Sequence, residues 1–219
     1  MIERKNYNKH PDKDTARIET FSDGVFAIAI TLLVLNIQVP HSADLKTSLL
    51  TELGNHWASY LAFFIGFFSI LVCWINHDHI CNYVLRCDNN MRILNSFILL
   101  VVVAVPFSTS LLAEYIGKNE QQIAVAIYGI TYCFMALVYA LMWNYAYKNK
   151  FTVPDVNDNL LRAIKKIYDI GIIYTLIALA VSFLSVIGGL ILYTLMFAIY
   201  LYPEHFATRL MKFNSKKNN

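Results

Sequence analysis

The stretch that decides the fold covers residues 17–40 and reads RIETFSDGVFAIAITLLVLNIQVP. After Asp23 it carries no charged residue, and Pro40 closes it. A helix that crosses the hydrocarbon core of a bilayer needs about 20 mostly apolar residues. Residues 18–39 meet this requirement and predict a transmembrane helix.

Five further apolar runs follow. Because these runs are uninterrupted, they lack the alternation of polar and apolar residues that marks a membrane β-barrel. The sequence therefore predicts an all-α integral membrane protein with six transmembrane helices, the last two separated by a turn near Ser185. The later runs are residues 57–75, 93–112, 123–145, 167–184 and 186–202.

The composition agrees with a membrane protein. Of the 219 residues, 57% are hydrophobic and only 15% are charged, whereas soluble domains average about 45–50% and about 25%. A globular core of this size cannot bury such long apolar blocks, which excludes an ordinary cytosolic enzyme, a disordered chain and a nucleic-acid-binding module. The four cysteines form no C-x-x-C pair and are expected to be buried, reduced thiols.

The basic residues indicate the orientation. With both termini inside, the cytoplasmic segments hold sixteen of the eighteen Lys and Arg residues, and only Lys46 and Lys118 fall outside. Such an asymmetry follows the positive-inside rule. We expect a multi-pass cell-membrane protein with a cytoplasmic tail at residues 1–16, a six-helix domain at 17–203 and a cytoplasmic tail at 204–219.

A secretory signal peptide is an alternative for the first run. A basic start, an apolar segment and the small residues Ser42-Ala43 fit its pattern. Glu19 and Asp23 argue against it, and cleavage would leave five helices and place the basic 148–166 loop on the wrong side of the membrane.

Polar residues inside the spans cluster near the cytoplasmic side. Ser22 and Asp23 begin the first helix after Arg17, the run 77–79 (His-Asp-His) ends the second, and Asn95 begins the third. Ionisable groups in a span are costly and need partners. We expect a network that ties Asp23 and Arg17 to the His77 group, and a structural lock is favoured over a proton relay.

A metal site is not expected in this group. Residues two apart on a helix point about 200° from each other, so His77 and His79 cannot hold one ion. His77 and Cys81 are four residues apart, but two ligands do not complete a zinc shell. No cofactor is predicted.

The first helix also carries a stripe. Ile28, Thr31, Leu32 and Leu35 follow the i, i+3, i+4, i+7 spacing of one helix face. Asp23 lies about 140° from Ile28. By itself, a stripe of this kind is typical of helix packing or lipid contact.

The heptapeptide at residues 17–23 resembles a known motif. Its Arg17, Phe21, Ser22 and Asp23 match the Arg-x-x-x-Phe-Ser-Asp pattern of the endolysosomal potassium channel family, in the bacterial form with one six-helix unit per subunit. The resemblance extends to Trp74 followed by His77 on the second helix, and to Asn95 and the run Pro106-Phe107-Ser108-Thr109 on the third.

The resemblance implies a homotetramer whose first helices line a central pore. In this family, apolar side chains five, nine and twelve residues after the motif aspartate form the constriction, with a small or hydroxyl residue at plus eight. Those positions are Ile28, Leu32, Leu35 and Thr31. The apolar three would form stacked rings over about 10 Å. The expected partners are further copies of the chain, potassium ions and the lipid bilayer, without nucleic acid.

The expected activity is passive, leak-like conduction of potassium with weak selectivity over sodium. No Thr-Val-Gly-Tyr-Gly filter segment and no arginine ladder are present. One departure concerns His77-Asp78-His79, because family members often have adjacent histidines, and the network is expected to be wired differently here. The alternatives are a small proton- or cation-coupled secondary transporter that uses Asp23 and His77, or a membrane enzyme. A transporter would need a site near the bilayer midplane, and an enzyme would need a nucleophile or a complete metal shell.

Overall fold

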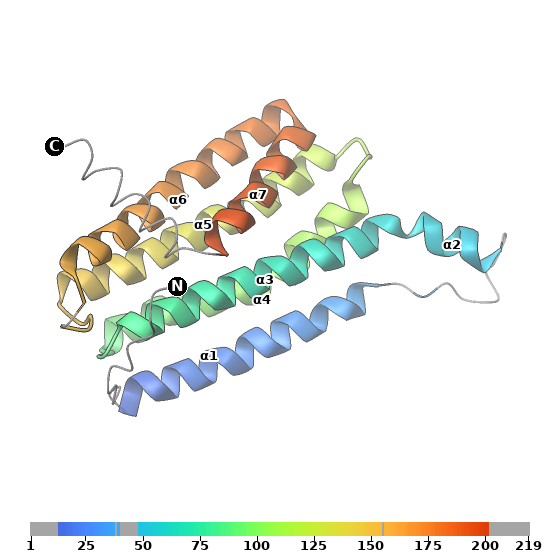
Figure 1. Cartoon of the computed structure of the whole chain (residues 1–219). Helices are drawn as coiled ribbons and strands as arrows, with labels where there is room; N and C mark the ends of the chain where they lie inside the picture. Colours follow the sequence, from blue (N-terminus) through green and yellow to red (C-terminus); the bar gives the residue numbers. More distant parts are fainter. Residues whose placement is uncertain (1–12, 38, 40–47, 155, 202–219) are drawn as a thin grey trace.

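Long helices that lie side by side make up the fold (Figure 1). The computed structural model describes residues 13–37, 39, 48–154 and 156–201. Its elements are α1 (Lys13–Leu32), the 3-10 helix η1 (Leu33–Asn36), α2 (Leu49–Asn55), α3 (Trp57–Tyr83), α4 (Asn89–Tyr115), α5 (Gln121–Lys148), α6 (Asp158–Leu184) and α7 (Val186–Tyr200).

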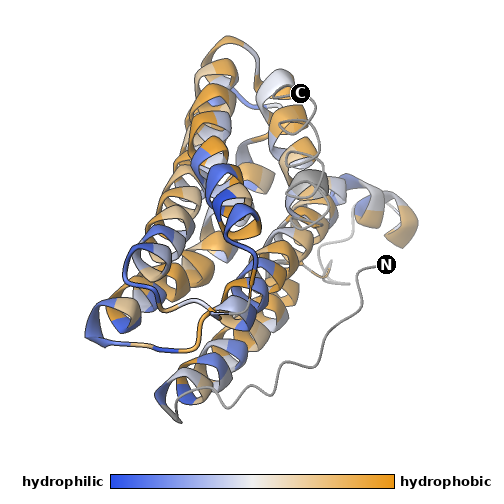
Figure 2. Cartoon of the chain, turned by 60° about the vertical axis from the view of Figure 1, so that its left-hand side comes forward, coloured by the Kyte–Doolittle hydropathy of each residue, from blue (hydrophilic) through white to orange (hydrophobic). Residues whose placement is uncertain are grey.

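Five of these helices are long and apolar enough to cross a membrane. They are α3, α4, α5, α6 and the continuous segment Asp14–Leu35. Hydrophobic residues cover most of their length, and hydrophilic residues gather near the helix ends (Figure 2). The predicted all-α membrane protein is therefore confirmed at this level. The sixth predicted span differs, because α7 has only 15 described residues of helix.

Polar caps extend several helices beyond the apolar runs. The Asp88 side chain accepts a hydrogen bond from the Met91 backbone at 2.9 Å, so α4 begins at Asn89 rather than at residue 93. Asn157 caps α6 in the same way, and that helix begins nine residues before its apolar run. Hydropathy locates the part of a helix that crosses lipid, whereas a side-chain acceptor sets where the helix begins.

The helices pack in a defined order. α4 packs on α5 and α5 on α6, while α1 lies against α3 and α4. α7 packs against α6, and its last residue is held twice: Tyr200 donates its hydroxyl to the Ile167 carbonyl at 3.0 Å and accepts from Asn76 Nδ2 at its own carbonyl at 2.9 Å. Gly171 makes room for the Tyr200 hydroxyl, because a Cβ there would overlap it.

Two features were not expected from the sequence. The short helix α2 precedes α3, and Ser48 caps its start. The loops that follow α3 and α5 also pair. Leu85 N donates to Phe151 O at 2.8 Å, and Val153 N donates to Tyr83 O at 3.0 Å. These bonds join two helical hairpins at one end of the bundle.

Some expectations fall on residues outside the described ranges. They include residues 1–12 of the predicted N-terminal tail, the 204–219 tail, Ser42-Ala43, Pro40 and Lys46. The last four residues of the predicted 1–16 tail are described and belong to the first turn of α1.

Candidate functional site

The predicted stripe on α1 is exposed. Ile28 is 60% exposed, Leu32 45% and Leu35 74%, and Thr31 is exposed as well. The opposite face of the same segment is buried, with Phe26, Ala29 and Leu33 each at most 2% exposed. These three residues belong to the core that α1 shares with α3 and α4. Ile28, Thr31 and Leu32 therefore face away from the rest of the subunit, whereas Leu35 is exposed and also borders a pocket that α3 and α4 line.

The stripe crosses the junction between the α-helix α1 and the 3-10 helix η1. This corrects the prediction of one continuous helix. The α-helix ends at Leu32, and Leu35 lies in η1. In a 3-10 helix, residues three apart lie directly above one another. Leu35 is thus brought in line with Leu32, and the rise from Ile28 to Leu35 becomes about 12 Å rather than about 10 Å. Thr31 donates its hydroxyl to Ile28 O at 2.9 Å, which leaves the oxygen lone pairs as outward-facing acceptors.

A buried polar chain joins three helices behind the stripe. Asn95 Nδ2 on α4 donates to Ser22 Oγ on α1 at 2.9 Å, and Asn95 Oδ1 lies 2.7 Å from His77 Nε2 on α3. An amide oxygen is only an acceptor, so His77 Nε2 carries the hydrogen. The other ring nitrogen, Nδ1, lies 3.7 Å from Cys81 Sγ. Ser22 and His77 are both fully buried.

The membership of this network corrects the sequence prediction. Ser22, rather than Asp23 or Arg17, reaches His77 through Asn95. Asp23 accepts a hydrogen bond from Trp74 Nε1 at 2.9 Å, which is a second tie between α1 and α3. Arg17 and Phe21 lie on the exposed side of α1. The reason is helical geometry, since Ser22 shares the buried face with Phe26, whereas Asp23 lies about 100° farther round.

The three residues His77, Asp78 and His79 point to separate partners. His77 faces Asn95, Asp78 accepts from Asn82 Nδ2 at 2.9 Å, and the His79 ring lies 5.1 Å from that of Tyr83. Each group serves a different packing contact, as the angle between successive helix positions requires.

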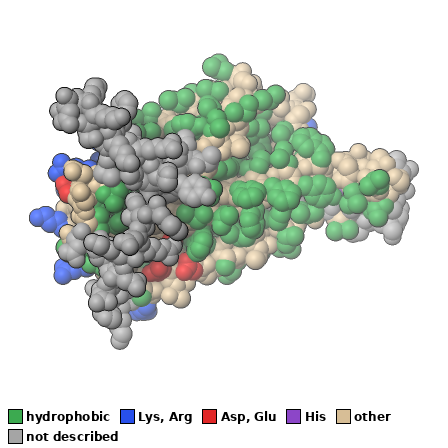
Figure 3. Space-filling view, in the orientation of Figure 1, with side chains coloured by type: hydrophobic (Ala, Val, Ile, Leu, Met, Phe, Trp, Pro, Cys, Tyr) green, Lys and Arg blue, Asp and Glu red, His purple; other side chains and the backbone are tan. Residues whose placement is uncertain are grey.

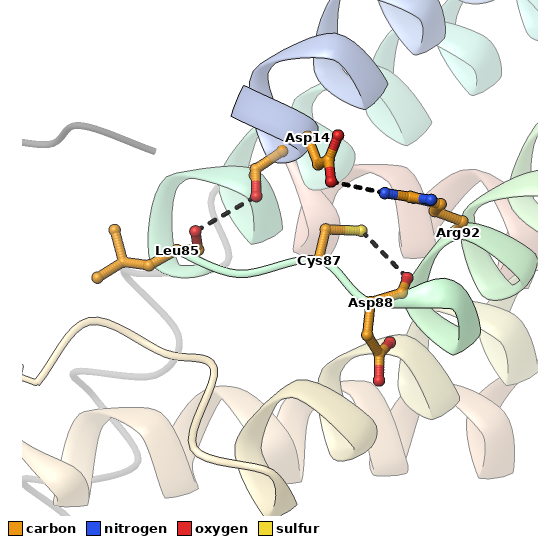
Figure 4. Close-up of polar contacts among 6 residues, drawn as sticks. Asp14, Leu85, Cys87, Asp88 and Arg92 are labelled. Carbon is orange, nitrogen blue, oxygen red and sulfur yellow. Dashed lines mark hydrogen bonds and ion pairs between the residues drawn. The ribbon is translucent and has the colours of Figure 1, made fainter. Parts of the chain in front are cut away.

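The N-terminal end of α1 has a further attachment, which sequence patterns did not indicate. Arg92 on α4 forms a 2.7 Å ion pair with Asp14, and Thr15 donates its hydroxyl to the Leu85 carbonyl at 3.3 Å (Figure 4). The first turn of α1 is thus attached to the segment between α3 and α4. Nothing local to the sequence marks these pairs, because their members lie about 70 residues or more apart.

Two groups in this segment have shifted pKa values. Burial raises the pKa of the Cys87 thiol to about 11, so it stays protonated near neutral pH. Desolvation acts to raise the pKa of Asp88, but the hydrogen bonds from the Tyr145 hydroxyl at 2.6 Å and from the Met91 backbone outweigh it. The Asp88 pKa therefore lies below its ordinary value.

Comparison with known proteins identifies the family. Residues 17–106, which contain most of α1, all of α3 and most of α4, match the family model "Endosomal/lysosomal potassium channel TMEM175". The potassium channel Cha6605_3372 of Chamaesiphon minutus is 42% identical over 175 residues, which cover 79% of this chain and 86% of that protein. The chain belongs to the TMEM175 family.

Further proteins named as TMEM175 channels or as potassium channels are also similar to this chain. The potassium channel B446_29190 of Streptomyces collinus is 38% identical over 78% of this chain and 84% of its own length. The human endosomal/lysosomal proton channel TMEM175 is 28% identical over 66% of this chain and 30% of its own length. The crystal structure of the lysosomal potassium-selective channel TMEM175 homologue from Chamaesiphon minutus superposes with a TM-score of 0.80 at 38% identity, covering 88% of this chain and 99% of that one.

Proposed function

We propose that the chain is one subunit of a homotetrameric potassium channel in which four copies of α1 surround a central pore. The observation that carries this proposal is that the exposed stripe Ile28, Thr31, Leu32 and Leu35 falls at the positions that the resemblance to this family assigns to the pore. The membership of the TMEM175 family supports the potassium activity, since both of the bacterial relatives described above are potassium channels.

Conduction would pass through a narrow apolar neck. Rings of Ile28, Leu32 and Leu35 exclude water when the neck is tight, and an ion must then shed part of its hydration shell to pass. Potassium holds its shell less tightly than sodium, so the neck favours potassium modestly. The Thr31 oxygen, oriented by its bond to Ile28 O, offers an acceptor inside the neck. Splaying of the α1 helices would wet the neck and open it.

The attachments of α1 support this role. The middle of the helix is tied to α3 and α4 through Asp23–Trp74 and Ser22–Asn95, and its inner end is tied through Asp14–Arg92. A pore helix held along one side by its own subunit leaves the other side free to face the axis.

The proposed topology has six spans, a channel domain at residues 17–203 and cytoplasmic tails at 1–16 and 204–219. The described basic residues support this orientation, because most gather at the end of the bundle that carries the 84–88 and 149–157 loops (Figure 3). That end also contains Arg92 and Lys148, whereas Lys118 lies in the loop at the other end.

Flux from liposomes that contain the purified protein tests the activity. A channel releases potassium down its gradient at a rate that does not change when the proton and sodium gradients are abolished. A flux that requires a counter-gradient of either ion would favour the secondary transporter instead. Crosslinking in detergent tests the assembly, and a ladder that ends at four subunits is expected.

Two single-cysteine variants add a test of the geometry. Leu35→Cys would place four thiols around one axis, so mild oxidation is expected to join neighbouring subunits. Leu184→Cys is the matched control, because this residue is also strongly exposed, at 87%, but lies at the end of α6. Equal crosslinking of the two variants would contradict the axial position of Leu35.

A further inference from the structure

A partly open cavity of about 40 Å³ lies between helices of one subunit, away from the stripe on α1. Its walls come from α3, α5, α6 and α7, and none of the described residues of α1 or α4 lines it. Much of the wall is apolar, including Val72, Met135 and Phe197. In Figure 1, α5, α6 and α7 lie on one side of α3 and α1 lies on the other.

Three buried oxygens belong to residues that line this cavity. Asn76, Tyr132 and Tyr168 are 3%, 1% and 2% exposed, and their side-chain oxygens have no hydrogen-bond partner in the described part of the chain. The orientation of the Asn76 amide is fixed, since its Nδ2 donates to Val72 O at 2.8 Å and to Tyr200 O at 2.9 Å. Oδ1 is therefore left as an acceptor without a donor.

Polar groups left without partners inside a membrane-spanning bundle are costly. Each one loses the free energy of a hydrogen bond when it is buried unsatisfied, and the surrounding lipid supplies no donor. A buried water needs about 10–15 Å³ and two to four polar neighbours. On this measure the cavity has room for about three or four waters, and three residues that line it carry buried oxygens without partners.

We propose that this cavity is a binding site for ordered water in each subunit, separate from the pore. One water donates to Asn76 Oδ1, and the cluster exchanges hydrogen bonds with the hydroxyls of Tyr132 and Tyr168. An alkyl chain of a lipid or detergent would fill the space but leave all three oxygens unpartnered. The site also connects α7 to the bundle, because the amide that binds water is the one that holds the Tyr200 carbonyl.

A density map at a resolution that shows water is the direct test. Ordered peaks within about 3.2 Å of Asn76 Oδ1 and of the Tyr168 hydroxyl are expected. An empty cavity, or elongated density without contact to these oxygens, would overturn the proposal.

A comparison of two tyrosine-to-phenylalanine variants provides a second test in solution. Tyr139→Phe is the reference, because Tyr139 donates its hydroxyl to the Cys73 carbonyl at 2.6 Å in the same region. If water binds, Tyr168→Phe removes the hydrogen bond between the Tyr168 hydroxyl and water. The thermal midpoint of this variant should then fall, as that of Tyr139→Phe should. If the cavity is dry, Tyr168→Phe removes an unpartnered hydroxyl and the midpoint stays or rises, which contradicts the proposal.

A substitution that fills the cavity distinguishes a water-filled cavity from an empty one, because the thermal midpoint should change in opposite directions. Ala136 lines the cavity, and Ala136→Val fills part of it. The midpoint is expected to fall if water is expelled and to rise if the space was empty. Potassium flux by Tyr168→Phe is expected to equal that of the unchanged protein, so this inference and the proposed channel activity fail independently.

Discussion

At the scale of single residues, Asn95 connects the three helices of the site. Its amide nitrogen and oxygen bind side chains on two other helices, Ser22 on α1 and His77 on α3. All three residues are buried. An amide can donate to a hydroxyl and accept from a ring N–H at the same time, so one residue serves both neighbours.

Replacing Asn95 is expected to destabilise the subunit. Asn95→Ala removes the partner of the Ser22 hydroxyl and that of the His77 Nε2–H, at a cost of about 1–3 kcal/mol for each. The thermal midpoint in detergent should fall well below that of Asn82→Ala, a change to an exposed residue whose amide donates to Asp78. Similar midpoints for the two variants would show that the buried chain does not stabilise the helices.

Asp88 predicts a pH dependence in the segment between α3 and α4. Its folded pKa lies below the ordinary value of 3.8. The carboxylate therefore stabilises the fold at pH values above the unfolded pKa, and this contribution is lost as the pH falls through the folded pKa. Asp88→Asn should lower the thermal midpoint at pH 7, and the difference from the unchanged protein should close in acid. A difference that grows in acid would contradict this account.

At the scale of elements, α7 depends on two glycines. Gly129 and Gly171 lie where the hydroxyls of Tyr193 and Tyr200 meet α5 and α6. This contact allows a short helix to pack tightly, because the absent Cβ lets an aromatic ring approach the backbone. The sequence contains these residues, but no local pattern shows which glycine a distant tyrosine meets.

Gly171→Ala is expected to displace α7. A Cβ at this position overlaps the Tyr200 hydroxyl, so the bond to Ile167 O must break or the helix must shift. The thermal midpoint should fall although alanine is the better helix former by about 1 kcal/mol. Adding Tyr200→Phe removes the overlapping atom and should restore part of the loss.

Gly54→Ala is the control for this change, because nothing lies within 4 Å of a Cβ at that position. Its midpoint should stay or rise. If Gly171→Ala behaved like Gly54→Ala, the contact between Tyr200 and α6 would not hold α7 in place.

Prediction from sequence succeeded where the signal was local. The long apolar runs gave α3 to α6, and the heptapeptide at 17–23 led to the family. The contacts between Ser22, Asn95 and His77 were predicted only as a group at one depth, because the rotation of each helix decides which polar residue faces inward. The attachment of Asp14 to Arg92 joins residues 78 apart, and only packing brings them together.

At the scale of the whole molecule, exposure alone does not distinguish a pore from lipid. Ile28 on α1 and Ile173 on α6 are each 60% exposed in one subunit. Both are isoleucines on apolar helices that could cross a membrane. What separates them is the assembly, in which α1 is proposed to face the axis and the exposed side of α6 to face lipid. The two residues therefore form a matched pair for testing the pore.

The reversal potential with potassium on one side and sodium on the other tests the pore most directly. A polar side chain in the neck wets it and weakens the cost of dehydration that separates the two ions. Ile28→Asn is expected to raise sodium permeability relative to potassium and to move the reversal potential toward zero. Ile173→Asn should leave the reversal potential where it is. If Ile28→Asn changes neither flux nor reversal potential, α1 does not line the pore.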